Sequence, residues 1–267
     1  SWEKIPQPIH KSEQAIIILL DLSPSMKAED VKPSRMIRAR LKLIDLLKLR
    51  KEGLTALVAF AGEAHTITPL TDDTKTIVSL VPSLSPSIMP LAGSNPEMAI
   101  DIALSLFTEA GINQGDVILI TDGIAPAAAD YITNKLGPQF SLSILGVGTD
   151  KGAPIPIESG GFAKDKQGNI VLARLDSSSL YSLSLNSGGD YQTLTANDTD
   201  IKTLNQITDK ATDQTRQLDR EFDLWLDRGP WLLLPLIPLL LLCFRRGWLL
   251  SLVFIVLIPM PDSTYAA

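Results

Sequence analysis

Residues 15–25 read AIIILLDLSPS, an apolar run that ends in an acidic, hydroxyl-rich turn. Successive apolar residues without alternation are typical of a strand that is buried on both faces of a sheet. Residues 116–122, DVILITD, repeat the arrangement later in the chain. Because such strands need cover on both faces, the two stretches predict a parallel sheet between layers of helices.

Strand and helix patterns alternate on either side of these stretches. Pro33 suits the first turn of a helix over 33–50, and residues 54–60 and 65–70 read as two strands joined as a hairpin. The alternation predicts an α/β fold with a doubly wound, mostly parallel, Rossmann-like sheet. The remaining predicted elements are a short helix over 73–81, a Ser/Pro-rich loop over 82–90, helices over 96–109 and 125–135, strands over 141–147 and 191–194, and a polar helix over 198–215.

The alternation breaks between residues 152 and 176. Pro154 and Pro156 are followed by Gly160-Gly161 and then by turn residues around Gly168. Turn residues between short apolar stretches predict a small β-hairpin insertion with glycine turns.

The composition is that of an acidic globular protein. Of 267 residues, 45% are hydrophobic and 20% charged, the formal net charge is −6, and there are one Cys and two His. The acidic balance argues against nonspecific binding to nucleic acid. The shortage of His and Cys argues against a zinc site, which usually draws three or four ligands from those residue types.

The C-terminal tail is far more apolar than the rest of the chain. Beyond residue 229 the only charged residues are the pair Arg245-Arg246 and Asp262. The runs 230–244 and 247–261 predict two transmembrane segments, although each is shorter than the roughly 20 residues of a straight spanning helix. The positive-inside rule places the arginine pair in the cytoplasm. We therefore expect an anchor in a bacterial inner membrane, with the globular domain in the periplasm.

Two alternatives remain for this tail. Both runs could form a buried core hairpin, and the second run also has the layout of a signal peptide. Ahead of the tail we expect a lead-in over 1–14, a globular domain over 15–220 and a juxtamembrane stretch over 221–229. Because residue 1 is Ser rather than Met, we expect a fragment or a processed form.

Acidic residues end two of the predicted strands. Asp21 follows the first strand, with Ser23 and Ser25 at alternate positions, and Asp122 follows strand 116–120. If the strands take the order 3-2-1-4, these two are neighbours and their side chains meet at the rim where open α/β sheets bind ligands. Two carboxylates and several hydroxyls form a hard oxygen ligand set, which suits Mg²⁺ or Mn²⁺. The sequence therefore predicts a divalent-metal site with a position open to an anionic oxygen.

The motif Asp-x-Ser-x-Ser, with Thr-Asp-Gly after a later strand, resembles the metal-ion-dependent adhesion site (MIDAS) of von Willebrand factor A (VWA) domains. The resemblance implies the VWA fold, a bound Mg²⁺ (alternatively Mn²⁺ or Ca²⁺), and recognition of a partner's acidic residue. The family has a Thr in a loop before a helix. Ser94 stands at that place and keeps the hydroxyl, while Thr71 is its rival. The implied metal ligands are Asp21, Ser23, Ser25, Ser94 and Asp122.

Further motifs are similar to those of membrane-anchored VWA proteins of bacterial aerotolerance (Bat) operons, BatB-like members included. This resemblance implies a stress or aerotolerance complex with other VWA proteins, TPR proteins or a MoxR-type AAA+ ATPase as partners. The motifs are DVKPSR at 30–35, FAG at 60–62, TPLT at 68–71, GVGT at 146–149, GAPIP at 152–156 and RRGW at 245–248.

Other interpretations of these residues stay open. The site could be vestigial in a membrane scaffold, or the first motif could be a mere capping turn. A phosphohydrolase of the haloacid-dehalogenase type needs a second Asp at position 23, which is Ser, and neither His10 nor His65 lies in a hydrolase motif. We therefore expect no enzymatic activity. Helix 33–50 is rich in cations, which predicts either a solvated face or a docking surface for an acidic partner, formed by Arg35, Arg38, Arg40, Lys42, Lys48, Arg50 and Lys51.

Overall fold

The computed structural model describes residues 2–7, 15–50, 52–157, 159–204 and 222–227. They belong to two compact units, residues 11–218 and the two chain ends, 1–10 with 219–267. In the unit formed by the chain ends, β1 (Trp2–Gln7) pairs antiparallel with β10 (Phe222–Asp227). The expected lead-in and juxtamembrane stretch thus each contain a strand. This pairing is not predicted from the sequence, because local patterns do not relate two strands from opposite ends of the chain.

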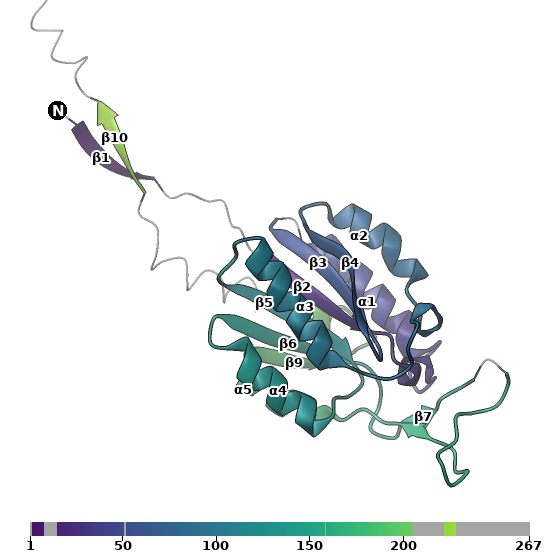
Figure 1. Ribbon diagram of the computed structural model, residues 1–267. Helices are drawn as coiled ribbons and strands as arrows, with labels where there is room; N and C mark the ends of the chain where they lie inside the picture. Colours follow the sequence, from purple (N-terminus) through teal and green to yellow (C-terminus); the bar gives the residue numbers. More distant parts are fainter. Residues whose placement is uncertain (1, 8–14, 51, 158, 205–221, 228–267) are drawn as a thin grey trace, which may run out of the picture. The chain divides into compact units, whose positions relative to one another are not determined.

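The larger unit is built around a six-stranded sheet with the order β4-β3-β2-β5-β6-β9 (Figure 1). Only β4 runs antiparallel to its neighbour; the other pairs are parallel. The predicted adjacency of the first strand and strand 116–120 is confirmed, because β2 pairs with β5 from Ile16 to Leu20. The strands are β2 (Ala15–Asp21), β3 (Leu54–Phe60), β4 (Ala64–Thr71), β5 (Gly115–Thr121), β6 (Phe140–Gly146) and β9 (Gly188–Thr193).

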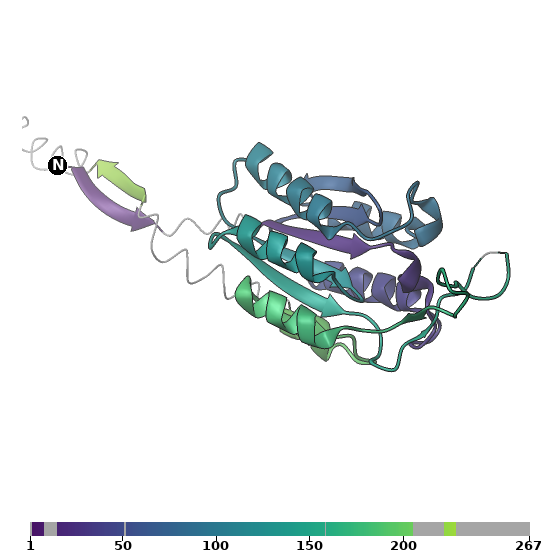
Figure 2. The ribbon, with the colours of Figure 1, turned by 60° about the horizontal axis from the view of Figure 1, so that its bottom comes forward.

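Helices cover both faces of this sheet (Figures 1 and 2). Alternate residues of β2 show how: Ile17 and Leu19 pack with α3, α4 and α5, while Ile16 and Ile18 pack with α1 and α2. Every residue of β2 is buried, as its uninterrupted apolar run predicts. The helices are α1 (Arg35–Leu49), α2 (Thr74–Leu80), α3 (Pro96–Glu109), α4 (Pro126–Leu136) and α5 (Ser177–Asn186).

Two helix boundaries depend on capping side chains. Helix α1 begins at Arg35 rather than Pro33, because the Ser34 hydroxyl accepts a hydrogen bond from the Ile37 amide at 3.3 Å. Helix α5 is absent from the sequence-based prediction. Its serine-rich sequence lacks a clear apolar stripe, but Asp176 caps it by accepting from the Ser179 amide. Of the polar helix expected over 198–215, residues 199–204 are helical, residue 198 is a bend, and residues 205–215 lie outside the described residues.

The insertion, residues 152–176, departs from the sheet beyond β6 (Figure 1). Its two limbs meet in a short antiparallel pair, β7 (Ala153–Pro154) with β8 (Leu172–Ala173), and two isolated bridges follow outward. Short 3-10 helices lie elsewhere in loops: η1 (Pro24–Lys27), η2 (Val81–Ser83) and η3 (Pro86–Ile88).

Across the part of the chain that the structure describes, none of the helices has both the length and the apolarity to cross a bilayer. The runs 230–244 and 247–261, predicted as transmembrane segments, lie outside the described residues.

Candidate metal centre

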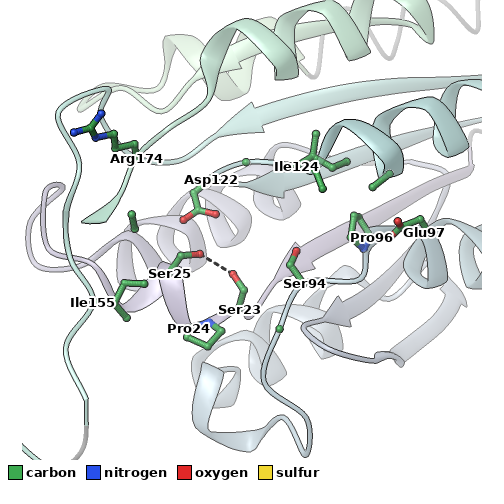
Figure 3. A pocket seen from close by; sticks show the side chains of 15 residues that line it. Ser23, Pro24, Ser25, Ser94, Pro96, Glu97, Asp122, Ile124, Ile155 and Arg174 are labelled. Atoms are coloured by element: carbon green, nitrogen blue, oxygen red, sulfur yellow. Dashed lines mark hydrogen bonds between the residues drawn. The ribbon is translucent and has the colours of Figure 1, made fainter. Parts of the chain in front are cut away.

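A pocket of about 400 Å³ opens where β2 and β5 end (Figure 3). We call it the strand-end pocket. Three loops place predicted site residues in its lining: Ser23 and Ser25 after β2, Ser94 before α3, and Asp122 after β5. Glu97, in the first turn of α3, adds a further carboxylate to the lining. The insertion contributes Ile155, Ala173 and Arg174 to the lining. Four of the five predicted site residues therefore line one cavity, although they come from distant parts of the sequence.

The fifth residue, Asp21, lies fully buried at the end of β2 and does not line the pocket. Its Oδ1 accepts a hydrogen bond from the Ser23 amide at 2.7 Å, and its Oδ2 accepts from the Thr121 hydroxyl at 2.6 Å. Asp21 thereby fixes the turn that carries Ser23. Burial, and next the charge of Asp122, raise the pKa of Asp21 from 3.8 to about 7.

The hydroxyls of Ser23 and Ser25 lie 2.9 Å apart, joined by a hydrogen bond (Figure 3). The Ser25 side chain also lies near the Asp122 carboxylate and lowers the pKa of that carboxyl. Burial raises the pKa of Asp122, whereas the Ser25 contact and the neighbouring Arg35 oppose that rise. The two hydrogen-bonded serines thus lie near the Asp122 carboxylate in the lining of the pocket (Figure 3).

These donors fit a hard divalent cation. The charge of Asp122 raises the pKa of the buried Asp21, so the two carboxylates repel, and a nearby cation would relieve that repulsion. The hydroxyls add neutral oxygen donors. The described residues hold no group of three or more His, Cys, Asp and Glu side chains placed to bind a metal. A metal here would therefore rely on serine oxygens as well as carboxylates.

Ser94 and Thr71 are separated by the sheet itself. Ser94 is exposed in the loop that enters α3 and lines the pocket. Thr71 pairs with Thr55 at the start of β3, whereas Asp21 pairs with Phe60 at the end of that strand. Because β4 runs antiparallel, its last residue lies beside the start of β3, whereas the pocket lies at the carboxyl ends of β2 and β5. The structure does not bring Thr71 to the site.

The interpretation of helix 33–50 as a solvated cationic face is wrong for three of its residues. The side chains of Arg35, Lys42 and Arg50 are buried. Lys42 reaches Asp200 at 2.7 Å, and Arg50 donates to the Thr55 hydroxyl at 3.1 Å. Arg35 belongs to the candidate site. Arg35 directly follows a capping serine, and its acceptor Asp30 stands only five residues before it. Its other acceptors, Asp122 and the Ala173 carbonyl, are distant in sequence, and no motif points to them.

Arg35 joins the site to its surroundings. Its Nη1 donates to Asp122 Oδ2 at 2.6 Å, and its Nε and Nη2 donate to the two oxygens of Asp30, each at 2.7 Å. Burial alone would raise the pKa of Asp30, but hydrogen bonds from Arg35 and Thr149 hold it at about 2. Asp30 is thus a permanent carboxylate that balances Arg35, and Arg35 in turn holds one oxygen of Asp122.

Comparisons with known proteins agree with this architecture. Residues 16–124 match the von Willebrand factor type A domain family. No curated protein matches the chain. An aerotolerance-related membrane protein from Bacteroides fragilis is 31% identical, covers 74% of this chain and 99% of its own, and superposes with a TM-score of 0.66.

A second solved structure, BatB from Bacteroides thetaiotaomicron, is also 31% identical; it covers 75% of this chain and 99% of its own, with a TM-score of 0.65. A von Willebrand factor type A protein from Catenulispora acidiphila is 17% identical, covers 77% of this chain and 43% of its own, and has a TM-score of 0.52. That third likeness concerns the fold alone.

Proposed function

Because this chain belongs to the BatB-like family of aerotolerance-related VWA-domain proteins, we propose that its VWA domain binds partner proteins through a divalent metal ion at the strand-end pocket. The observation that carries the proposal is the convergence of Ser23, Ser25, Ser94 and Asp122 on one cavity above the buried Asp21. Mg²⁺ is the expected ion, with Mn²⁺ or Ca²⁺ as alternatives.

Each residue has a role in this scheme. The hydroxyls of Ser23, Ser25 and Ser94 are direct ligands. Asp21 and Asp122 act as ligands directly or through water and orient the serines. For Asp21, the hydrogen bond from the Ser23 amide supports this role. When bound, the ion supplies a Lewis-acidic centre with open coordination positions.

The expected partner group is a carboxylate. Two carboxylates formally balance a divalent ion, but Asp122 shares its charge with Arg35, so a bound ion stays electrophilic and attracts an outside Asp or Glu. Apolar side chains also line the pocket, among them Ile124 and Ile155. A partner that combines an acidic residue with apolar neighbours fits this pocket.

The cellular setting is proposed from the family. Candidate partners are other Bat-type VWA proteins, TPR proteins or a MoxR-type AAA+ ATPase, in an aerotolerance or stress complex. We propose an inner-membrane location with the VWA domain in the periplasm. A phosphatase fused after Arg246 should then be inactive, and an active fusion would contradict this topology.

Partner recovery from bacterial membranes tests the metal-dependent role. The full chain should retain partners in Mg²⁺, lose them in EDTA, and lose them in the Asp21→Ala variant. Equal recovery under all three conditions would contradict a metal-gated interface. Purified protein should not turn over generic phosphate or acyl esters; turnover that vanishes in Asp21→Ala would instead assign an enzyme.

One observation favours a second candidate, a scaffold whose site takes no metal. Arg35 already supplies a cation to Asp122 at 2.6 Å, which stabilises the carboxylate without an ion. Titration of the wild-type chain with Mn²⁺ decides between the two. Binding of one ion supports the metal-dependent role, and its absence supports the scaffold.

A further inference from the structure

We propose that Arg35 is a positioning residue that couples the strand-end pocket to the insertion. The inference rests on the metal site of the proposed function and assigns to this site a means of acting on a neighbouring segment. It follows from the contacts of one buried guanidinium.

The guanidinium of Arg35 touches both walls of the pocket. Nη1 donates to Asp122 Oδ2 at 2.6 Å, and Nη2 donates to the carbonyl oxygen of Ala173 at 2.8 Å. Asp122 and Ala173 both line the pocket, one from the end of β5 and the other from the insertion. A displacement of the Asp122 carboxylate therefore acts on the same group that holds the insertion.

The guanidinium itself has little freedom to move independently. Both oxygens of Asp30 accept from it, and Asp30 Oδ2 also accepts from the amide and the hydroxyl of Thr149, each at 2.8 Å. A Cβ added to Gly148 would lie 2.7 Å from Arg35 Cζ, so the planar group rests directly on that backbone. Its fork of donors is locked in one orientation, which makes it a rigid link.

The base of the insertion forms backbone hydrogen bonds with residues at the site, whereas the outer part of the hairpin forms them within itself. Beside Ala173, the Leu175 amide donates to the Thr149 carbonyl at 3.0 Å, and the Asp176 amide donates to the Asp122 carbonyl at 3.3 Å. Farther out, backbone hydrogen bonds join residues of the hairpin to one another; the Val171 amide, for example, donates to the Ala163 carbonyl at 2.9 Å. A change in the position of site residues would therefore affect the hairpin through the base of the insertion.

Occupancy of the pocket and order in the insertion should therefore depend on one another. An ion that draws on Asp122 competes with Nη1 for its negative charge, and coupling of this kind is reciprocal. Lysine keeps the charge of arginine but lacks the planar fork, so it cannot hold Asp30, Asp122 and Ala173 at once. The substitution Arg35→Lys separates geometry from charge.

The test uses the full chain with Mn²⁺ as probe and hydrogen–deuterium exchange as a second readout. In wild type, Mn²⁺ should change amide exchange in residues 171–176. In Arg35→Lys, Mn²⁺ affinity should fall about ten- to hundredfold, as for other residues that orient a metal ligand. Exchange in 171–176 should be faster than in wild type and insensitive to Mn²⁺. Arg38→Lys is the matched control on the same helix, since the Arg38 side chain donates to the Lys32 carbonyl, outside the pocket.

The outcomes are distinguishable. If wild type binds no Mn²⁺, the proposed metal site and this inference both fail. If Arg35→Lys binds Mn²⁺ like wild type and 171–176 exchange unchanged, the coupling fails while the proposed function stands. Tighter Mn²⁺ binding in Arg35→Lys would also overturn it. Should Arg35→Lys not fold, Asp30→Asn loosens the same guanidinium without touching the pocket, and the same two readouts apply.

Discussion

The loops after β2 and β5 look alike in sequence but solve the problem of a buried carboxylate differently. Asp21 is held by neutral donors, the Ser23 amide and the Thr121 hydroxyl, and its pKa rises to about 7. Asp122 is held by the cation of Arg35. Among the described residues, the carboxylate at the end of β2, Asp21, therefore lacks a directly bonded cation, whereas Asp122 after β5 is already ion-paired with Arg35. The cation that balances Asp122, Arg35, thus lies outside the Asp-x-Ser-x-Ser and Thr-Asp-Gly motifs that define the site.

The largest expected effect concerns the ion-paired side. Asp30→Ala leaves Arg35 buried with Asp122 as its remaining carboxylate and removes the acceptor of Thr149. Breaking a buried pair in this way costs about 3–5 kcal/mol of unfolding free energy, measurable by urea denaturation. The control is Glu29→Ala, whose exposed pair with Lys32 should contribute little. Equal stability of the two variants would show that the Asp30–Arg35 pair is not structural.

The uncompensated side should dominate metal binding. Asp21→Ala removes the carboxylate that fixes the Ser23 turn, so Mn²⁺ affinity should fall by more than about a hundredfold. Calorimetric titration of the full chain measures it. Affinity within about threefold of wild type would mean that Asp21 serves the fold rather than an ion.

The same contrast predicts a pH dependence in the metal-free protein. In the folded state Asp21 holds its proton up to about pH 7, whereas the unfolded chain releases it near pH 3.8. The folded state thus binds more protons in this window, and Asp21 lowers the free energy of unfolding as pH rises from about 4 to 7. Asp21→Asn removes that loss. In EDTA, the unfolding free energy of Asp21→Asn minus that of wild type should be larger at pH 8 than at pH 5. A difference that does not change with pH would refute the raised pKa of Asp21.

The smallest effect separates Ser94 from Thr71. Ser94→Ala removes one neutral donor from the pocket and should weaken Mn²⁺ binding severalfold, on the order of 1 kcal/mol. Thr71 lies at the opposite end of the strands, so Thr71→Ala should leave the Mn²⁺ affinity unchanged. A reversed result would contradict the strand arrangement at the site.

Much of the site was accessible from sequence because it follows strands. A run such as residues 15–20 predicts a fully buried strand, and parallel neighbours bring their carboxyl ends to one rim. The positions of Asp21, Ser23, Ser25 and Asp122 follow from that geometry. Helix α5 did not, since its serines blur the apolar period and its start depends on one capping carboxylate.

By itself, the sequence determined the βα alternation and the oxygen-rich ends of the two buried strands, because local periodicity dictates them. The adjacency of β2 and β5 followed from the sequence only under one assumed strand order, which the tertiary structure has. Only the tertiary structure decided that Arg35 is a buried link rather than a surface charge, that Ser94 and not Thr71 lines the pocket, and that the insertion joins its wall. These facts rest on contacts between distant segments. A guanidinium selects its acceptors by position in space, and no spacing along the chain encodes that choice.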